Sequence, residues 1–272
     1  MEEFDLKELK KLYIPKHDST KGDNGRLMVI AGSVLFHAAS LWPLTVASRF
    51  VDMVYYSSAS MNNEIVQKDK ESFRNGIIVP RKDLEKYVEE ADCILIGPGL
   101  PRDDGRKSAD DNTKELTERL LAKFPDKKWV IDGGSLQVIN PDILPKTSII
   151  TPNKKEFDML FKKEACTKNA MNAAKRYGIT VLLKGEVDVV ANKDRSVIIK
   201  GGNQGMTKGG TGDVLAGLTA SFYCKNDAFL SACTASFINK KAGDSLYKTM
   251  GFYYNSSDLA NEIPKVMKEL IL

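Results

Sequence analysis

The sequence has few of the residues that mark secreted or metal-clustered proteins. Its 272 residues include only four cysteines and two histidines, and no two cysteines show the CxxC spacing of a zinc or redox site. Cys93 and Cys224 lie in apolar runs, so we expect them to be small core residues. This cysteine usage indicates a reducing compartment, and it predicts a cytoplasmic protein without a structural zinc site.

Membrane-directing runs are also scarce. Residues 1–16 lack the apolar core of a signal peptide. The uncharged stretch 27–48 is long enough to span a bilayer, but it contains Gly32, Ser33, Pro43 and further polar residues. Such a composition favours a strand, a turn and a buried helix over a lipid-facing helix, so we expect no membrane association.

Charge of one sign is not in large excess. The 40 basic and 36 acidic residues leave a net charge of +4, which over this length does not indicate nucleic-acid binding. Hydrophobic residues make up 42% and charged residues 28% of the chain, as in an ordinary soluble globular protein. No linker, repeat or low-complexity run divides the sequence, so we expect one domain over residues 1–272.

Short apolar runs alternate with longer helical patterns along the chain. Strand candidates are 26–31, 51–57, 76–80, 92–97, 128–131, 148–151 and 179–183, and helix candidates are 38–50, 81–90, 107–124, 165–177, 214–224, 228–246 and 256–270. The runs 187–191 and 197–200 follow with no helix between them, which predicts antiparallel edge strands. The whole pattern predicts an α/β fold, a three-layer αβα sandwich around a mostly parallel sheet.

The most informative stretch is GGNQGMTKGGTGDVLAG, residues 201–217. Glycine-rich backbone adopts positive φ readily and brings successive N–H groups close to a ligand. A helix that starts at 211–213 would add unpaired N–H groups and the positive end of its dipole. Together these features predict an anion site, best suited to phosphate.

Asp213 is a carboxylate placed where an anion is expected, and two interpretations of it stay open. The first is an N-cap for the following helix, because aspartate is a favoured capping residue. The second is a base that acts on a hydroxyl or water beside the phosphate. The local sequence does not decide between them.

The same stretch resembles the signature of a known family. The run GNQGMTKGGTGDVLAG is similar to that of the ADP/ATP-dependent NAD(P)H-hydrate dehydratases, which are members of the ribokinase-like superfamily. The superfamily's shared element corresponds to Gly210-Thr211-Gly212-Asp213, and the longer run with Asn203, Gly205 and Met206 is more specific. The resemblance extends from about residue 16 to the C-terminus and implies a ribokinase-like sandwich.

The resemblance also implies an activity and a set of site residues. A nucleotide, ADP or ATP, would phosphorylate the ring hydroxyl of hydrated NADH or NADPH, with Mg²⁺ as cofactor, and loss of phosphate would restore the double bond. Asp213 would be the catalytic base. Nucleotide-binding residues would be Lys184, Gly185, Glu186, Val187, Asp188, Gly209, Gly210, Thr211 and Gly212, and substrate-binding residues would be Ala39, Gly97, Gly99, Asn153 and Asp213. The metal ligands stay unassigned.

Two positions depart from the family pattern. Ala38 stands where a glycine is usual, which weakens the expectation of a tight approach of the ligand there. Asn153 stands where histidine is usual, and asparagine forms hydrogen bonds but carries no proton. With Glu156 three residues on, Asn153 also matches a capping box at a helix start.

Two other functions share much of this sequence pattern. A ribokinase-like kinase for a vitamin precursor or sugar would use the same loop and Asp213 but would not need the extension around Asn203. A non-catalytic nucleotide sensor would gain nothing from a carboxylate beside phosphate. The resemblance further implies a homo-oligomer, such as a tetramer, and a separate epimerase chain, because residues 1–23 are too few for an epimerase domain.

Overall fold

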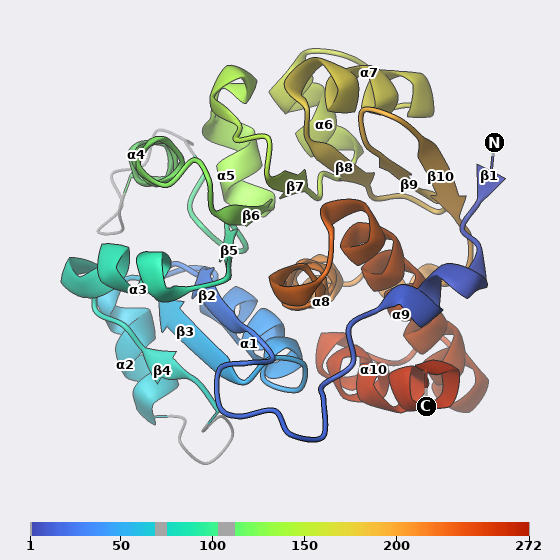
Figure 1. The fold of residues 1–272 in the computed structure, drawn as a ribbon, viewed down its shortest axis with the longest axis horizontal. Helices are drawn as coiled ribbons and strands as arrows, with labels where there is room; N and C mark the ends of the chain where they lie inside the picture. The colour runs from blue at the N-terminus through green and yellow to red at the C-terminus, as the bar shows by residue number, and fades with distance from the viewer. Residues whose placement is uncertain (1, 69–74, 103–111, 272) are drawn as a thin grey trace.

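The computed structural model describes residues 2–68, 75–102 and 112–271 (Figure 1). Within these ranges a ten-stranded sheet has the order β1-β10-β9-β8-β7-β6-β5-β2-β3-β4. The strands are β1 (Glu2–Glu3), β2 (Arg26–Ile30), β3 (Met53–Ser57), β4 (Ile77–Ile78), β5 (Cys93–Ile96), β6 (Lys128–Ile131), β7 (Ser148–Ile150), β8 (Thr180–Leu183), β9 (Asp188–Ala191) and β10 (Ser196–Ile199). All the strands predicted from the apolar runs are therefore present.

The sheet is mostly parallel. The pairs from β4 through β3, β2, β5, β6 and β7 to β8 are parallel, and only β9 runs against its neighbours β8 and β10. This confirms a parallel-rich sheet with antiparallel pairing near one edge. The short strand β1, which the sequence did not predict, pairs in parallel with β10 and forms that edge.

The central strands are mostly apolar because helices bury both faces of the sheet. In β5, Cys93 and Leu95 face one core while Ile94 and Ile96 face the other, and all four side chains are fully buried. A strand covered on both faces reads as a continuous apolar run rather than an alternating one. Each such side chain contributes about 1.5–3 kcal/mol through removal from water.

Helices cover both faces and complete the three predicted layers (Figure 1). One face carries α1 (Leu41–Ala47), α8 (Thr211–Lys225), α9 (Ala228–Met250) and α10 (Ser256–Ile271). The other carries α3 (Leu84–Glu90), α4 (Thr113–Lys123), α5 (Gly133–Val138), α6 (Lys154–Phe161) and α7 (Thr167–Tyr177), while α2 (Ser60–Lys68) lies against β4. Across the described ranges, no helix combines the length and apolar character needed to cross a bilayer.

Some helices differ from the sequence prediction. The stretch 38–50 is a 3₁₀ turn, η2 (His37–Ser40), followed by α1 with Pro43 in its first turn. Helix α4 begins after its cap Asn112, and residues 107–111 of the predicted helix lie outside the described residues. Helices α2 and α5 were not predicted. In α5 a Cβ at Gly134 would lie 2.2 Å from the carbonyl oxygen of Leu100, so close packing requires glycine there.

The carboxyl ends of β5, β6, β7 and β8 meet at one edge of the sheet. Gly97, Asp132, Thr151 and Lys184 each follow directly after one of these strands. Ligands of parallel α/β sheets bind at this edge, outside the carboxyl ends of the strands. The fold therefore gathers residues from four distant segments at one place.

Candidate active site and adjacent cavity

The glycine-rich loop leads directly into α8. Gly210 is the N-cap with φ 93°, and Asp213 is the third residue of the helix. The Thr211 hydroxyl donates to the carbonyl oxygens of Met206 and Lys208, at 2.7 and 2.9 Å, and so closes the loop. The capping interpretation of Asp213 is therefore wrong, because the cap is a glycine and Asp213 lies in the first turn.

Trp42 and the start of α10 hold this loop from the side. A Cβ at Gly210 would lie 2.5 Å from the Trp42 ring, so both the positive φ and the packing require glycine. The indole Nε1 of Trp42 donates to the Ser257 hydroxyl at 3.3 Å. The Ser256 hydroxyl donates to the carbonyl oxygen of Gly209 at 2.6 Å. The loop is thus fixed by α1 and α10 before any ligand binds.

Three carboxylates, those of Asp132, Glu156 and Asp213, act on one lysine, Lys184, at the edge of the sheet. Lys184 Nζ lies 2.7 Å from Asp132 Oδ1 and 3.9 Å from Glu156 Oε2. The Thr151 hydroxyl also donates to Asp132 Oδ1, at 2.8 Å. Lys184 reaches the start of α8 as well, since a Cβ at Gly212 would lie 3.4 Å from Nζ. The ammonium and the positive end of α8 therefore act on the same space.

Burial and the close approach of these charged groups shift the pKa values of Asp213, Glu156 and Lys184. Burial, together with the charges of Asp132 and Glu156, raises the pKa of Asp213 to about 8, although Lys184 opposes the rise. Burial also raises the pKa of Glu156. Burial alone would lower the pKa of Lys184, but the carboxylates of Asp132 and Glu156 outweigh it and raise that pKa. Lys184 thus stays charged while Asp213 titrates near neutrality.

Asn153 forms the capping box that the sequence predicted. Its Oδ1 accepts from the Glu156 backbone N–H at 3.0 Å, and Glu156 Oε2 accepts from the Asn153 backbone N–H at 2.9 Å. The same hydrogen bond holds the Glu156 carboxylate on the Lys184 side of α6. A capping residue in the sequence therefore also orients one of the acids of the site.

Gly97, Gly99 and Ala39 form a close-packed group beside Asp132. Gly97 has φ 121°, and a Cβ there would lie 1.8 Å from the Asp132 carbonyl oxygen. A Cβ at Gly99 would lie 2.4 Å from that of Ala39. The structure brings these three predicted substrate-binding residues together on the β2–β5–β6 side, and it gives both glycines a packing reason.

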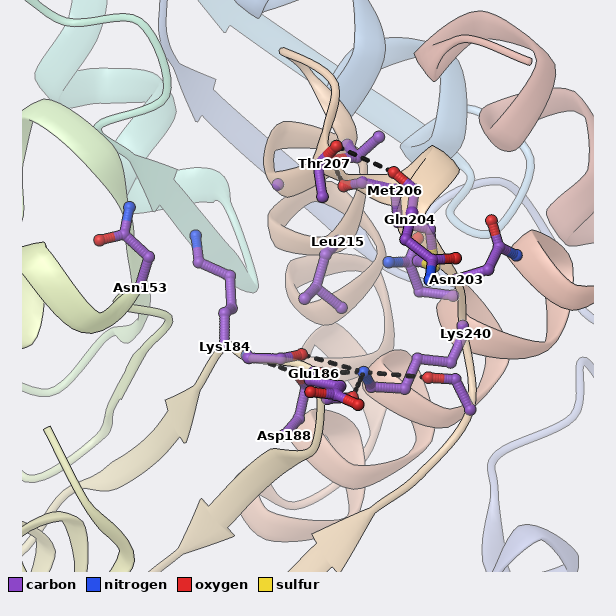
Figure 2. A pocket seen from close by; sticks show the side chains of 16 residues that line it. Asn153, Lys184, Glu186, Asp188, Asn203, Gln204, Met206, Thr207, Leu215 and Lys240 are labelled. Carbon is purple, nitrogen blue, oxygen red and sulfur yellow. Dashed lines mark hydrogen bonds and ion pairs between the residues drawn. The ribbon is translucent and has the colours of Figure 1, made fainter. Parts of the chain in front are cut away.

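A cavity of about 680 Å³ opens between α6, α8, α9 and the loops after β8 and β10 (Figure 2). Seven predicted site residues line it: Asn153, Lys184, Gly185, Glu186, Asp188, Thr211 and Gly212. The other lining residues are Gly201, Gly202, Asn203, Gln204, Met206, Thr207, Leu215, Asn239 and Lys240. The other predicted site residues, all within the described ranges, do not line this cavity: Val187, Gly209 and Gly210 of the nucleotide set, and Ala39, Gly97, Gly99 and Asp213 of the substrate and catalytic set.

The sequence did not single out four residues of the site. Asp132 follows a strand in the same way as Lys184, so its position was a usable signal, and Glu156 was interpreted only as part of a cap. Asn239 and Lys240 lie in the middle of α9, where no local pattern marks them. Asn239 is 4% exposed, and within the described residues its Oδ1 accepts no hydrogen bond although it lines the cavity.

Comparison with known proteins identifies the family. Residues 27–265 match the family model described as NAD(P)H-hydrate dehydratase. The chain belongs to the NAD(P)H-hydrate dehydratase family. A relative from Nitrosopumilus maritimus, named ADP-dependent (S)-NAD(P)H-hydrate dehydratase, is 34% identical over 285 residues, covering 96% of this chain and 95% of the relative. The family that the sequence resembles is therefore the family to which the chain belongs.

Longer and structurally similar relatives complete the comparison. A bifunctional NAD(P)H-hydrate repair enzyme of Methanocaldococcus jannaschii is 35% identical over 271 residues, or 97% of this chain, and the chain spans about half (52%) of that relative's length. The crystal structure of the ADP/ATP-dependent NAD(P)H-hydrate dehydratase of Bacillus subtilis, co-crystallised with ATP and Mg²⁺, superposes with a TM-score of 0.81. It is 18% identical and covers 99% of this chain and 98% of its own, so it confirms the fold of the family.

Proposed function

We propose that the chain catalyses the nucleotide-dependent dehydration of hydrated NADH or NADPH. Transfer of a phosphoryl group from ADP or ATP to the ring hydroxyl turns a poor leaving group into a phosphate ester. Departure of phosphate with an adjacent ring proton restores the double bond. Family membership and the name of the Nitrosopumilus maritimus relative support this reaction.

The observation that carries the proposal is the environment of Asp213. A base works best when its pKa lies near the working pH, and the buried acid cluster raises the pKa of Asp213 to about 8. In the proposed mechanism Asp213 takes the proton of the ring hydroxyl as the oxygen attacks phosphorus. Lys184 and the backbone N–H groups at the start of α8 stabilise the negative charge on the phosphoryl group.

We place the nucleotide in the cavity beside this site. A volume of about 680 Å³ lies within the range of cofactor pockets. Lys184, Thr211 and Gly212 line its phosphate end, next to the positive end of α8. The unpartnered Asn239 Oδ1 favours a polar ligand, because a buried acceptor is normally satisfied. Hydrated NADH or NADPH would bind on the side of Ala39, Gly97 and Gly99, with Asn153 and Asp213 between the two ligands.

Mg²⁺ fits the chemistry of the residues present. Asp132 and Glu156 supply carboxylate oxygens that share a single lysine, so a divalent cation would offset their excess negative charge. Among the described residues there is no cluster of three or more His, Cys, Asp or Glu suited to a metal. This agrees with Mg²⁺, which typically uses one or two carboxylates together with waters and substrate phosphates. When bound, Mg²⁺ would neutralise charge on the phosphates.

The test is Asp213→Asn, which keeps the shape of the side chain and removes the proton acceptor. With hydrated NADH and ADP or ATP, recovery of dihydronicotinamide absorbance should slow by about 10²–10⁴-fold, the usual contribution of a general base. Nucleotide affinity should hold or improve slightly, because a negative charge near the phosphates is gone. Near-normal turnover by a folded Asp213→Asn protein would contradict the role of Asp213.

We further propose that residues 1–272 work as one dehydratase domain, in the cytoplasm, as a homo-oligomer. Light scattering coupled to size exclusion measures the oligomer directly. The name of the Nitrosopumilus maritimus relative specifies the (S) epimer of the hydrate. Repair of the other epimer would need an epimerase, which we propose to be a separate chain. Purified protein given a mixture of epimers should then stop with one of them unrepaired.

A further inference from the structure

Lys240 places a buried ammonium beneath the wall of the nucleotide cavity. It reaches from the middle of α9, and its side chain is 7% exposed. Nζ donates to the carbonyl oxygens of Glu186 at 2.9 Å, Gly185 at 3.2 Å and Gly201 at 3.3 Å. Asp188 Oδ1 lies 3.4 Å away (Figure 2). Four oxygen atoms from two chain segments, 185–188 and the loop at Gly201, therefore surround one cation.

The Asp188 carboxylate belongs to the same network. Its Oδ1 accepts from the Gly185 backbone N–H at 2.8 Å, and its Oδ2 accepts from the Ser236 hydroxyl at 2.7 Å. Ser236 lies one turn before Lys240 on α9. The helix thus fixes the turn between β8 and β9, the start of β9 and the loop after β10, and these segments line the cavity.

The arrangement matters because every partner of the ammonium is an oxygen atom with negative charge or partial charge. Without the cation, three carbonyl dipoles and a carboxylate would face one another in a buried space, which is costly. They would also repel the phosphates of a nucleotide in the adjacent cavity. The oxygen set is the kind that binds a monovalent cation, and Lys240 supplies that cation from the chain itself.

We propose that Lys240 is a positioning residue of the nucleotide site, a tethered cation that sets the spacing of segments 185–188 and 200–202. It acts through the backbone of these segments and touches no reacting atom. The inference rests on the proposed function in one respect, since it requires that the cavity binds ADP or ATP. Neither the glycine-rich loop nor the group of Asp132, Glu156 and Asp213 identifies Lys240 as a residue of this site.

The experiment compares Lys240→Ala with wild-type protein by calorimetric titration with ADP and by steady-state kinetics. Misplacement of the wall should raise the dissociation constant for ADP by about 10²-fold. The KM for the hydrate and the kcat at saturating nucleotide should stay within about threefold, because Lys240 contributes to nucleotide binding alone. Ammonium or potassium chloride should restore ADP affinity in Lys240→Ala, whereas choline chloride at equal ionic strength should not.

Lys241→Ala is the matched control, because Lys241 is the next residue of α9, is exposed, and places its ammonium over the Phe237 ring. It should bind ADP like wild type. Lys240→Met keeps the apolar stem and tests the same point if Lys240→Ala does not fold. In Lys240→Met the methionine side chain fills the position of the cation. ADP affinity should therefore fall, and added ammonium should not restore that affinity.

Several results would overturn the inference. The first is an ADP affinity equal to that of wild type in Lys240→Ala or Lys240→Met. The second is an equal loss of affinity for ADP and for the hydrate in Lys240→Ala that ammonium or potassium chloride does not restore. If wild-type protein binds neither ADP nor ATP, the inference and the proposed function both fail. If wild-type protein binds ADP but does not convert the hydrate back to NADH or NADPH, only the proposed dehydration fails. The ADP titrations then still decide the role of Lys240.

Discussion

At the scale of single residues, the site is defined by an imbalance of charge. Asp132, Glu156 and Asp213 are three acids around one ammonium, that of Lys184. The Lys184 ammonium lies 2.7 Å from Asp132, so it offsets the negative charge of that carboxylate most strongly. At Asp213, burial and the charges of Asp132 and Glu156 outweigh the attraction of Lys184, so Asp213 keeps its proton to a higher pH. A protein that needs a base at neutral pH can obtain one in this way from an ordinary aspartate.

The first prediction concerns the pH dependence of activity. Because the base must be ionised, kcat/KM for the hydrate should fall about tenfold per unit below the pKa of Asp213 and level off above about pH 8. Lys184 lowers this pKa, so Lys184→Met should move the midpoint to higher pH. It should also raise the KM for nucleotide more than it lowers kcat. A flat profile for wild type between pH 6 and 9 would contradict the assignment.

A second prediction concerns stability at high pH. The folded pKa of Asp213 lies above the value of 3.8 typical of an unfolded chain. As pH rises from about 4 to about 8, the unfolded chain ionises first, so the folded state loses stability across this window. Asp213→Asn should therefore raise the Tm by at least about 4 °C at pH 9 and change it little at pH 4. Asp194→Asn, at an exposed position, should leave both values unchanged.

At the scale of elements, α6 offers the sharpest test. Asn153→Ala removes the side-chain half of the capping box and should lower the free energy of unfolding by about 1 kcal/mol. It should also raise the KM for one of the ligands, because the Asn153 side chain lines the cavity. Asn153→Asp keeps the cap and should retain stability. A change in the number of ionisations in the pH–rate profile of Asn153→Ala would contradict a neutral role for Asn153.

The elements also show what sequence patterns can predict. Strands buried on both faces appear as apolar runs, and the loop before α8 appears as a run of glycines before a helix, so both were predicted. Helix α5 was missed because Gly133 and Gly134 are dictated by the approach of Gly97 and Leu100, segments far away in the chain. Lys240 was missed for the same reason, since its oxygen partners lie 39 to 55 residues away. Tertiary proximity leaves no local pattern.

At the scale of the whole molecule, the N-terminal segment closes an edge of the sheet. Strand β1 pairs with β10, and the Phe4 ring packs 5.9 Å from that of Phe237 on α9. Phe4→Ala should therefore lower the free energy of unfolding by about 3 kcal/mol. It should also increase aggregation, because an uncovered strand edge recruits other chains. Leu6→Ala, at an exposed position nearby, should change stability by at most about 0.5 kcal/mol.

Denaturant titration and light scattering measure these two effects. Equal stability of Phe4→Ala and Leu6→Ala would show that the N-terminal segment is dispensable for the edge. Strand β1 was not among the predicted strands, because two consecutive glutamates carry no strand signal. Their pairing follows from the position of Phe4 in the core.

The contact between Trp42 and Gly210 gives the protein an optical reporter. The chain has two tryptophans, and Trp129 is fully buried on the far face of the sheet, with its Nε1 donating to the Phe124 carbonyl. Trp42 is half-buried and lies against the loop that we assign to phosphate. Indole emission responds to nearby charge and to its hydrogen-bond partners. Titration with ADP should therefore change the fluorescence of a Trp129→Phe protein, so that binding can be followed in real time without a label or turnover.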